Sequence, residues 1–247
     1  MKTSIKTRDG KIMTVAPAGT TAKKDSYLTT AEVKKAIADH ARKARSPKGR
    51  KTTADYIPFN DAFQRSRQII LGSHKIDNPK IGFLIMLGIN TGFRISDLLE
   101  FRHKDITNLK PGDELTIIEQ KTGKSRSIQI NIDVCIAYAD MINRFPSDNR
   151  PGPEDYIFTS QKRTVFSIMS VNRYLKQIFP DVKNISSHSL RKSFGRAFYN
   201  SYEDKGHGLA ILMDALGHSS MEITKSYLGL RKEEVNKGYM NLVHAHL

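Results

Sequence analysis

The chain has 247 residues, and 40 Lys and Arg against 25 Asp and Glu give it a formal net charge of +15 and a pI near 9.8. This balance favours a polyanionic partner, either nucleic acid or an anionic membrane face, over a neutral one. The lone Cys135 excludes an internal disulfide and a cysteine zinc site, and no signal-peptide core or membrane-length apolar run occurs, so we expect a soluble, cytoplasmic protein.

The first 57 residues differ in composition from the rest of the chain. Residues 1–26 are rich in Lys, Thr, Ala and Gly without periodicity, which predicts a flexible basic arm that either follows DNA phosphates or is a solvated tail. Residues 27–57 predict a short helical segment and a basic linker. Thr29 and Glu32 form a capping box for a helix ending near Arg45.

From residue 58 to the C-terminus the pattern is mainly helical. Apolar residues at helical spacing follow capping signals such as Asn78-Pro79 and end at glycines such as Gly92. The expected helices cover residues 60–71, 79–92, 95–99, 132–144, 170–179, 189–202, 208–216 and 232–246. The last of these is amphipathic, and it either docks on a neighbouring protomer or packs on its own domain.

One hairpin interrupts the helices. Residues 115–119 and 127–130 alternate or are β-branched, and the polar residues Lys121 to Lys124 between them suit a turn. The expected fold class is therefore α+β, mainly α-helical, with a small antiparallel sheet.

Two arginines have the chemistry to hold a phosphodiester. Arg94 follows Gly92 at a helix junction, and Asp97 lies three residues on, where it could orient the guanidinium. Arg191 is three residues from His188 near a predicted helix start, so both can face one phosphate. Arginine neutralises phosphate oxygens with directed hydrogen bonds. Taken alone, each of these short motifs more often marks an ordinary surface residue.

The remaining candidates carry proton-transfer and nucleophilic chemistry. His218 follows the helix stop Gly217, and Tyr227 is a phenol that could attack phosphorus and store the ester bond. Lys121 on the hairpin turn could protonate the departing oxygen, a role that Lys124 or Arg126 could also fill. No acidic cluster with the spacing of a Mg²⁺ site occurs, so we expect no metal.

Taken together, these segments resemble the tyrosine recombinase, or phage integrase, family over residues 79–230. Asp97 stands where that family often has Glu, and Lys192 stands where it often has His. The matching boxes are Thr91–Leu99, Gln120–Gly123, Ser187–Phe194 and Leu216–Ser220, the last leading to Tyr227 nine residues after His218.

The resemblance implies a catalytic domain over residues 58–247 with a small three-stranded antiparallel sheet. It implies that Arg94, Arg191 and His218 hold the scissile phosphate, that His188 assists proton transfer, and that Lys121 is the general acid. Tyr227 would form a 3′-phosphotyrosine, and the resemblance implies neither a metal nor a nucleotide cofactor. The implied partners are double-stranded DNA, further copies of the chain in a tetramer on paired sites, and in some systems an accessory DNA-bending protein.

Fewer than eighty residues precede the matching region, which starts at residue 79, whereas relatives typically carry a helical domain of about a hundred residues there. A minimal integrase of phage or mobile-element origin is the expectation. The expected function is site-specific DNA recombination or integration. The alternatives are a type IB topoisomerase-like or telomere-resolving enzyme, which uses the same residues, and a DNA-binding module that has lost catalysis.

Overall fold

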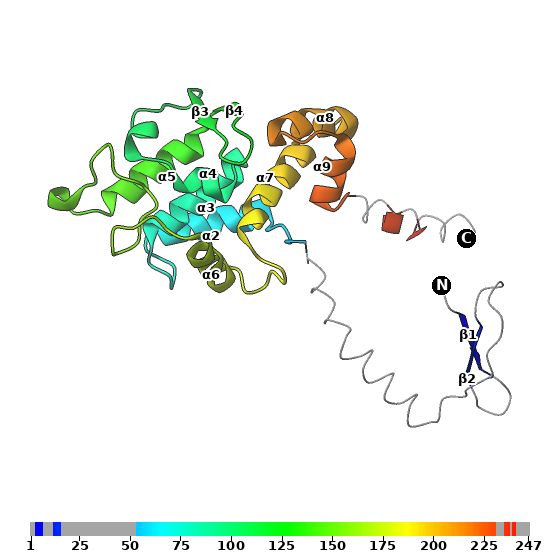
Figure 1. Cartoon of the computed structure of the whole chain (residues 1–247). Helices are drawn as coiled ribbons and strands as arrows, with labels where there is room; N and C mark the ends of the chain where they lie inside the picture. The colour runs from blue at the N-terminus through cyan, green and yellow to red at the C-terminus, as the bar shows by residue number, and fades with distance from the viewer. Residues whose placement is uncertain (1–2, 7–11, 16–52, 231–234, 238, 241–247) are drawn as a thin grey trace. The chain divides into compact units, whose positions relative to one another are not determined.

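The computed structural model describes residues 3–6, 12–15, 53–230, 235–237 and 239–240. It divides into two units, residues 1–52 and 53–247 (Figure 1). In the first unit, β1 (Thr3–Lys6) pairs antiparallel with β2 (Ile12–Val15) inside the segment expected to be a flexible arm. The expected helix from Thr29 to Arg45 and the basic linker after it lie outside the described residues.

The second unit is built around one apolar helix, α3 (Pro79–Thr91). The Asn78 side chain accepts a hydrogen bond from the Ile81 amide at its start, and Gly92 ends it in the left-handed conformation with φ 61°. Nearly every α3 side chain is buried, because α2 (Phe59–Ile70), α5 (Ile132–Asn143) and α7 (Ser187–Ser201) pack around it. A helix that is apolar on all sides requires such enclosure.

The short helix α4 (Ile95–Leu99) leads from α3 towards the hairpin of β3 (Glu114–Ile118) and β4 (Ser125–Gln129). The strands pair antiparallel, with Leu115 opposite Ile128. The prediction of a three-stranded sheet is wrong: in the described part of the chain this sheet has two strands. Asn131 caps α5 two residues after β4 ends, so a helix and not a further strand follows β4.

The C-terminal part is helical, as predicted, with α6 (Ile168–Ile178), α7, α8 (Lys205–Leu216) and α9 (Met221–Leu228). Short 3₁₀ turns η1 (His103–Asp105) and η2 (Ser147–Asn149) lie in connecting segments. The sequence prediction missed α9, which Ser220 caps through the Ile223 amide. Of the expected helix at 232–246, residues 235–237 and 239–240 are helical and the others lie outside the described residues.

Helix α7 joins two apolar cores. One of its sides contacts α3 and the main core, and it also contacts α8 and α9. The second, smaller core consists of Leu209, Leu212, Leu216, Leu228 and Leu230. This arrangement holds the ends of α3 and α8 and the helix α9 around the start of α7.

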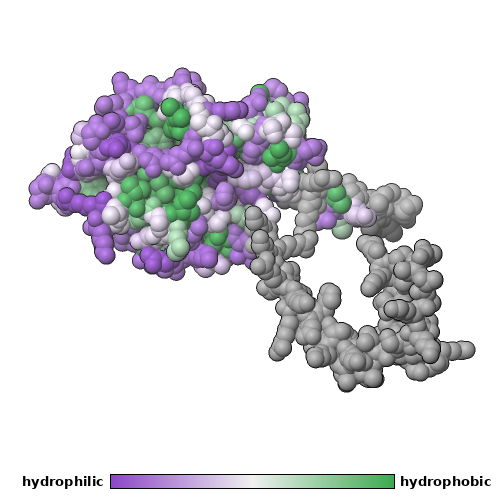
Figure 2. Space-filling view, in the orientation of Figure 1, coloured by the Kyte–Doolittle hydropathy of each residue, from purple (hydrophilic) through white to green (hydrophobic). Residues whose placement is uncertain are grey.

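The mainly helical α+β fold predicted from the sequence is confirmed. The surface in view is largely hydrophilic with separate apolar patches (Figure 2), and exposed apolar side chains include Ile118 and Met169. None of the helices in the described ranges is long and apolar enough to cross a membrane.

Candidate active site

Gly92 sets the position of Arg94. Its φ of 61° belongs to the left-handed region, and a Cβ atom at this position would lie 2.3 Å from Cδ1 of Phe194. Only glycine fits both the turn and this contact. The chain then passes through Phe93, so that Arg94 becomes the extended N-cap residue of α4.

Arg191 is buried, with 4% of its surface exposed, and it connects two helix ends. Its Nη1 donates to the Gly92 carbonyl at 2.7 Å, and its Nη2 donates to the Leu216 carbonyl at 2.6 Å. These carbonyls lie at the C-terminal ends of α3 and α8, where the helix dipole favours a cation. Burial and the charge of Arg94 lower the pKa of Arg191.

Glu119, which the sequence analysis did not select, is the carboxylate that pairs with Arg94. Its Oε2 lies 2.6 Å from Arg94 Nη1 and accepts a hydrogen bond from the Thr122 hydroxyl at 2.8 Å. Burial raises the pKa of Glu119, but the hydrogen bonds and charge of Arg94 outweigh it, and the net pKa is lowered. Glu119 therefore carries a negative charge at neutral pH.

Asp97 does not take the role expected for it. Its Oδ1 accepts a hydrogen bond from the Gln120 backbone amide at 3.0 Å, and Glu119 contacts Arg94 instead. The expectation relied on the three-residue spacing within a helix. Arg94 has extended backbone angles at the N-cap, so this spacing does not bring the two side chains together.

Arg126 is a further cation at the site, which the sequence analysis considered only as a substitute for Lys121. It donates to the Thr91 carbonyl at 2.9 Å and lies 4.8 Å from the centre of the Phe93 ring. Burial, with the charge of Arg191, lowers the pKa of Arg126 to about 10. The alternation of side chains along β4 could have indicated that Arg126 faces the domain, because Arg126 and the half-buried Ile128 are two residues apart and lie on one face of the strand.

The two candidate histidines are uncharged at neutral pH. His188 lies in the first turn of α7, and desolvation together with the charges of Arg191 and Lys192 lowers its pKa. His218 follows the left-handed Gly217, and its Nδ1 lies 3.0 Å from the Thr224 hydroxyl. Burial, with the nearby arginines, lowers the pKa of His218 to about 4. A neutral imidazole is able to accept a proton.

Tyr227 lies on α9 and points its hydroxyl towards the start of α7. The hydroxyl donates to the His188 carbonyl at 3.5 Å, and the ring meets the His218 ring edge-on with centroids 5.2 Å apart. Burial raises the pKa of Tyr227 to about 12, although the charges of Arg191 and Arg94 act in the opposite direction. The Lys192 ammonium lies 5.2 Å from the centre of this ring.

The structure thus brings five of the six predicted residues into one electrostatic neighbourhood. The charges of Arg94 and Arg191 act on His188, His218 and Tyr227 together. Lys121, the sixth, is exposed on the turn between β3 and β4, and its charge acts on His188. A cationic site with neutral histidines and a phenol suits an anionic substrate that is attacked by a nucleophile.

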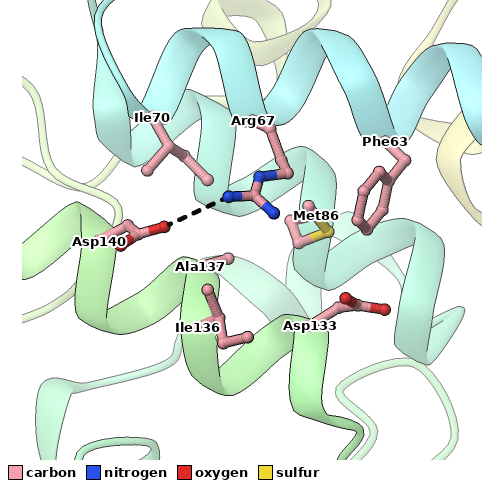
Figure 3. Close-up of a pocket in the computed structure, with 8 residues that line it drawn as sticks. All are labelled: Phe63, Arg67, Ile70, Met86, Asp133, Ile136, Ala137 and Asp140. Carbon is pink, nitrogen blue, oxygen red and sulfur yellow. Dashed lines mark ion pairs between the residues drawn. The ribbon is translucent and has the colours of Figure 1, made fainter.

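A separate small pocket lies between α2, α3 and α5 (Figure 3). Arg67 and Asp140 face each other across it at 4.0 Å. Its lining contains none of the six predicted site residues. In the part of the chain that the structure describes, no group of three or more His, Cys, Asp or Glu side chains is placed to hold a metal ion.

The sequence of this chain is similar to those of known integrases and recombinases. The model of the Phage integrase family matches residues 63–234. The "Probable integrase/recombinase YoeC" of Bacillus subtilis (strain 168) is 31% identical over 182 residues, which cover 72% of this chain and 91% of that protein.

Two solved structures share the fold at lower identity. The XerH site-specific recombinase bound to palindromic difH substrate has a TM-score of 0.55 and 22% identity, covering 76% of this chain and 53% of that one. The lambda integrase tetramer bound to a Holliday junction has a TM-score of 0.51 and 18% identity, covering 80% and 56%. The chain therefore spans little more than half the length of these two proteins.

Proposed function

The chain belongs to the phage integrase family, and from this we propose that it is a site-specific DNA recombinase that cleaves and rejoins strands through Tyr227. The observation that carries the proposal is the position of the Tyr227 hydroxyl. It lies beside the His188 carbonyl and within the field of two arginines that come from distant parts of the chain. Arg94 and Arg191 would hold the non-bridging oxygens of the scissile phosphate, together with His218.

The proposed reaction exchanges one phosphate ester for another. The Tyr227 oxygen attacks phosphorus, so that the new bond to phosphorus forms while the bond to the 5′ oxygen breaks. Lys121 gives a proton to that oxygen, and neutral His188 assists removal of the phenol proton. The product is a 3′-phosphotyrosine. Attack by a 5′ hydroxyl reverses the step, and the bond energy is kept without ATP or a metal.

The phenol requires this assistance. With a pKa of about 12, Tyr227 is protonated at neutral pH, and a phenol is a much weaker nucleophile than a phenolate. Transfer of its proton to a neutral imidazole in the transition state avoids forming a free phenolate. The two histidines with lowered pKa are available in the basic form for this purpose.

The proposed partners are double-stranded DNA and further copies of the chain. The net charge of +15 suits a DNA phosphate backbone. The named relatives include a recombinase bound to its DNA substrate and an integrase tetramer on a Holliday junction. We place the chain in the same kind of tetramer on paired sites, with the 232–246 segment docking on a neighbour and a DNA-bending protein as a further partner.

The proposed domain organisation follows the order of the segments in the chain. We propose that residues 58–247 form the catalytic domain and that the reaction takes place in the cytoplasm. The basic arm expected at residues 1–26 and the helical segment and linker expected at residues 27–57 lie mostly outside the described residues. Phage or mobile-element origin is part of the same proposal.

The direct test is incubation of the protein with EDTA and nicked or supercoiled DNA from its own genetic neighbourhood. We expect an adduct that survives SDS and maps to Tyr227. Exchange between paired sites would identify a recombinase, whereas relaxation of any supercoiled circle would favour a topoisomerase. Binding without an adduct, on DNA known to hold the site, would favour a module without catalysis or a missing helper protein. A strict Mg²⁺ requirement would overturn the mechanism.

A further inference from the structure

Glu119 contacts both Arg94, which is proposed to bind the phosphate, and the turn that carries the proposed general acid Lys121. It is the residue directly after β3, two positions before Lys121, and it is 4% exposed. Its carboxylate contacts Arg94 at 2.6 Å and lies 4.0 Å from Arg126 Nη1. Burying a carboxylate is costly unless it is paired, so its place beside these arginines stabilises both the charge and its position.

The same residue organises the turn that carries Lys121. Thr122 donates its hydroxyl to Glu119 Oε2 at 2.8 Å. The Gly123 amide donates to the Glu119 carbonyl at 2.8 Å, and the Thr122 amide does so at 3.3 Å. The residues that flank Lys121 in the turn are therefore tied to Glu119 by both side chain and backbone.

A second carboxylate binds the backbone on the other side of Lys121. Asp97 on α4 accepts the Gln120 amide at 3.0 Å, so the residue before Lys121 is bound to the helix that begins after Arg94. The Lys121 side chain itself remains exposed. The turn is anchored on both sides, and the lysine projects from an anchored backbone.

We propose that Glu119 is a positioning residue that ties the Lys121 turn to Arg94, so that one buried carboxylate places the general acid relative to the phosphate-binding arginine. The inference rests on the proposed function. Glu119 touches neither substrate nor leaving group in this scheme. It acts through Arg94 on one side and, together with Thr122, through the Lys121 turn on the other.

The test uses a DNA substrate that does not need a general acid. In a duplex with sulfur in place of the 5′ bridging oxygen at the scissile phosphate, the thiolate leaves without being protonated. The variants are Glu119→Gln and Thr122→Val, with Thr116→Val as the matched control. Thr116 lies exposed on β3 of the same hairpin, where its hydroxyl contacts Ser127 at 2.6 Å.

We expect Thr122→Val to slow adduct formation on the oxygen substrate about tenfold, because a hydrogen bond to a charged group is lost. Sulfur should restore its rate to near that of the unchanged chain. Glu119→Gln should lose more of its rate on the oxygen substrate and regain at least about tenfold on the sulfur substrate, because the general acid is then not needed. Arg94→Ala should gain nothing from sulfur, and Thr116→Val should behave as the unchanged chain on both.

Rescue of Lys121→Ala by sulfur without rescue of Glu119→Gln and Thr122→Val would overturn the inference, because Glu119 would then serve Arg94 alone. Failure of sulfur to rescue Lys121→Ala would instead remove Lys121 from the proposed reaction.

A readout that does not depend on activity separates these cases further. Amide hydrogen exchange over residues 120–124 should accelerate in Glu119→Gln and Thr122→Val and not in Thr116→Val, and unchanged exchange in the first two would contradict the proposed tie.

Discussion

Arg191 Nη1 donates a hydrogen bond to the Gly92 carbonyl at 2.7 Å, which places a buried guanidinium at the C-terminal end of α3. The second terminal nitrogen binds the Leu216 carbonyl at the end of α8. A residue proposed to hold a DNA phosphate thus also bridges two helix ends. Its two functions have to be separated by experiment, because loss of either would lower activity.

For Arg191→Ala we expect a free energy of unfolding lower by about 1–3 kcal/mol, because two helix-end carbonyls lose a charged donor. DNA cleavage should fall by about a hundredfold or more. Urea unfolding and adduct formation measure the two effects. Arg173→Ala is the matched control, since Arg173 is exposed on α6. A destabilised variant that still cleaves at the original rate at low temperature would remove Arg191 from the phosphate site.

For Tyr227→Phe we expect no covalent adduct and nearly unchanged DNA affinity. The change removes the hydroxyl that donates to the His188 carbonyl and leaves the ring in place against His218. Fluorescence anisotropy and SDS gels measure the two properties. Tyr239→Phe, at a tyrosine that is 69% exposed, should retain the adduct. A persistent adduct in Tyr227→Phe that disappears in Tyr239→Phe would reassign the nucleophile.

For Gly92→Ala we expect a loss of about 3 kcal/mol or more in the free energy of unfolding. The left-handed φ costs about 1–2 kcal/mol, and the clash with Phe194 adds an overpacking cost. Gly112→Ala is the control, since Gly112 also has a positive φ, of 94°, but a Cβ there would meet nothing within 4 Å. Equal losses in the two variants would show that contact with Phe194 does not matter.

Stability should decrease in mild acid because of His103. This side chain is 2% exposed, contacts the Tyr138 hydroxyl at 2.8 Å, and has its pKa lowered to about 4, first by burial and then by the charge of Lys80. The folded pKa is below the usual value of about 6.5, so the unfolded chain binds the proton more readily. Stability is therefore complete above about pH 6.5 and declines as the pH falls towards 4.

The His103 contribution should reach about 2 kcal/mol at pH 5, as judged from the pKa difference. Urea unfolding at pH 7.5 and pH 5 measures it. The variant His103→Gln should show a smaller difference between the two pH values than the unchanged chain. If the difference is the same in both, other groups cause the acid sensitivity.

Three elements of the second unit show which features the sequence could predict and which it could not. Asn78, Pro79 and Gly92 define α3 correctly because a cap involves residues only a few positions apart. The same kind of signal, from Ser220 to Gly229, is present for α9, although Tyr227 was expected to lie in the connection before a later helix. The third strand was implied only by the family resemblance and not by a strand pattern in the sequence, and α5 begins at Ile132, where a helix was expected.

The sequence by itself determined the helical class, the limits of most helices, and which six residues to examine, because caps, periodicity and motif spacing are local properties of the chain. Only the tertiary structure decided which groups meet. It paired Arg94 with Glu119 instead of Asp97, placed the half-buried Arg126 beside Phe93, and placed Arg191 between the ends of α3 and α8. Such contacts depend on how segments up to a hundred residues apart pack, and the strength of each charge interaction depends on the burial that this packing produces.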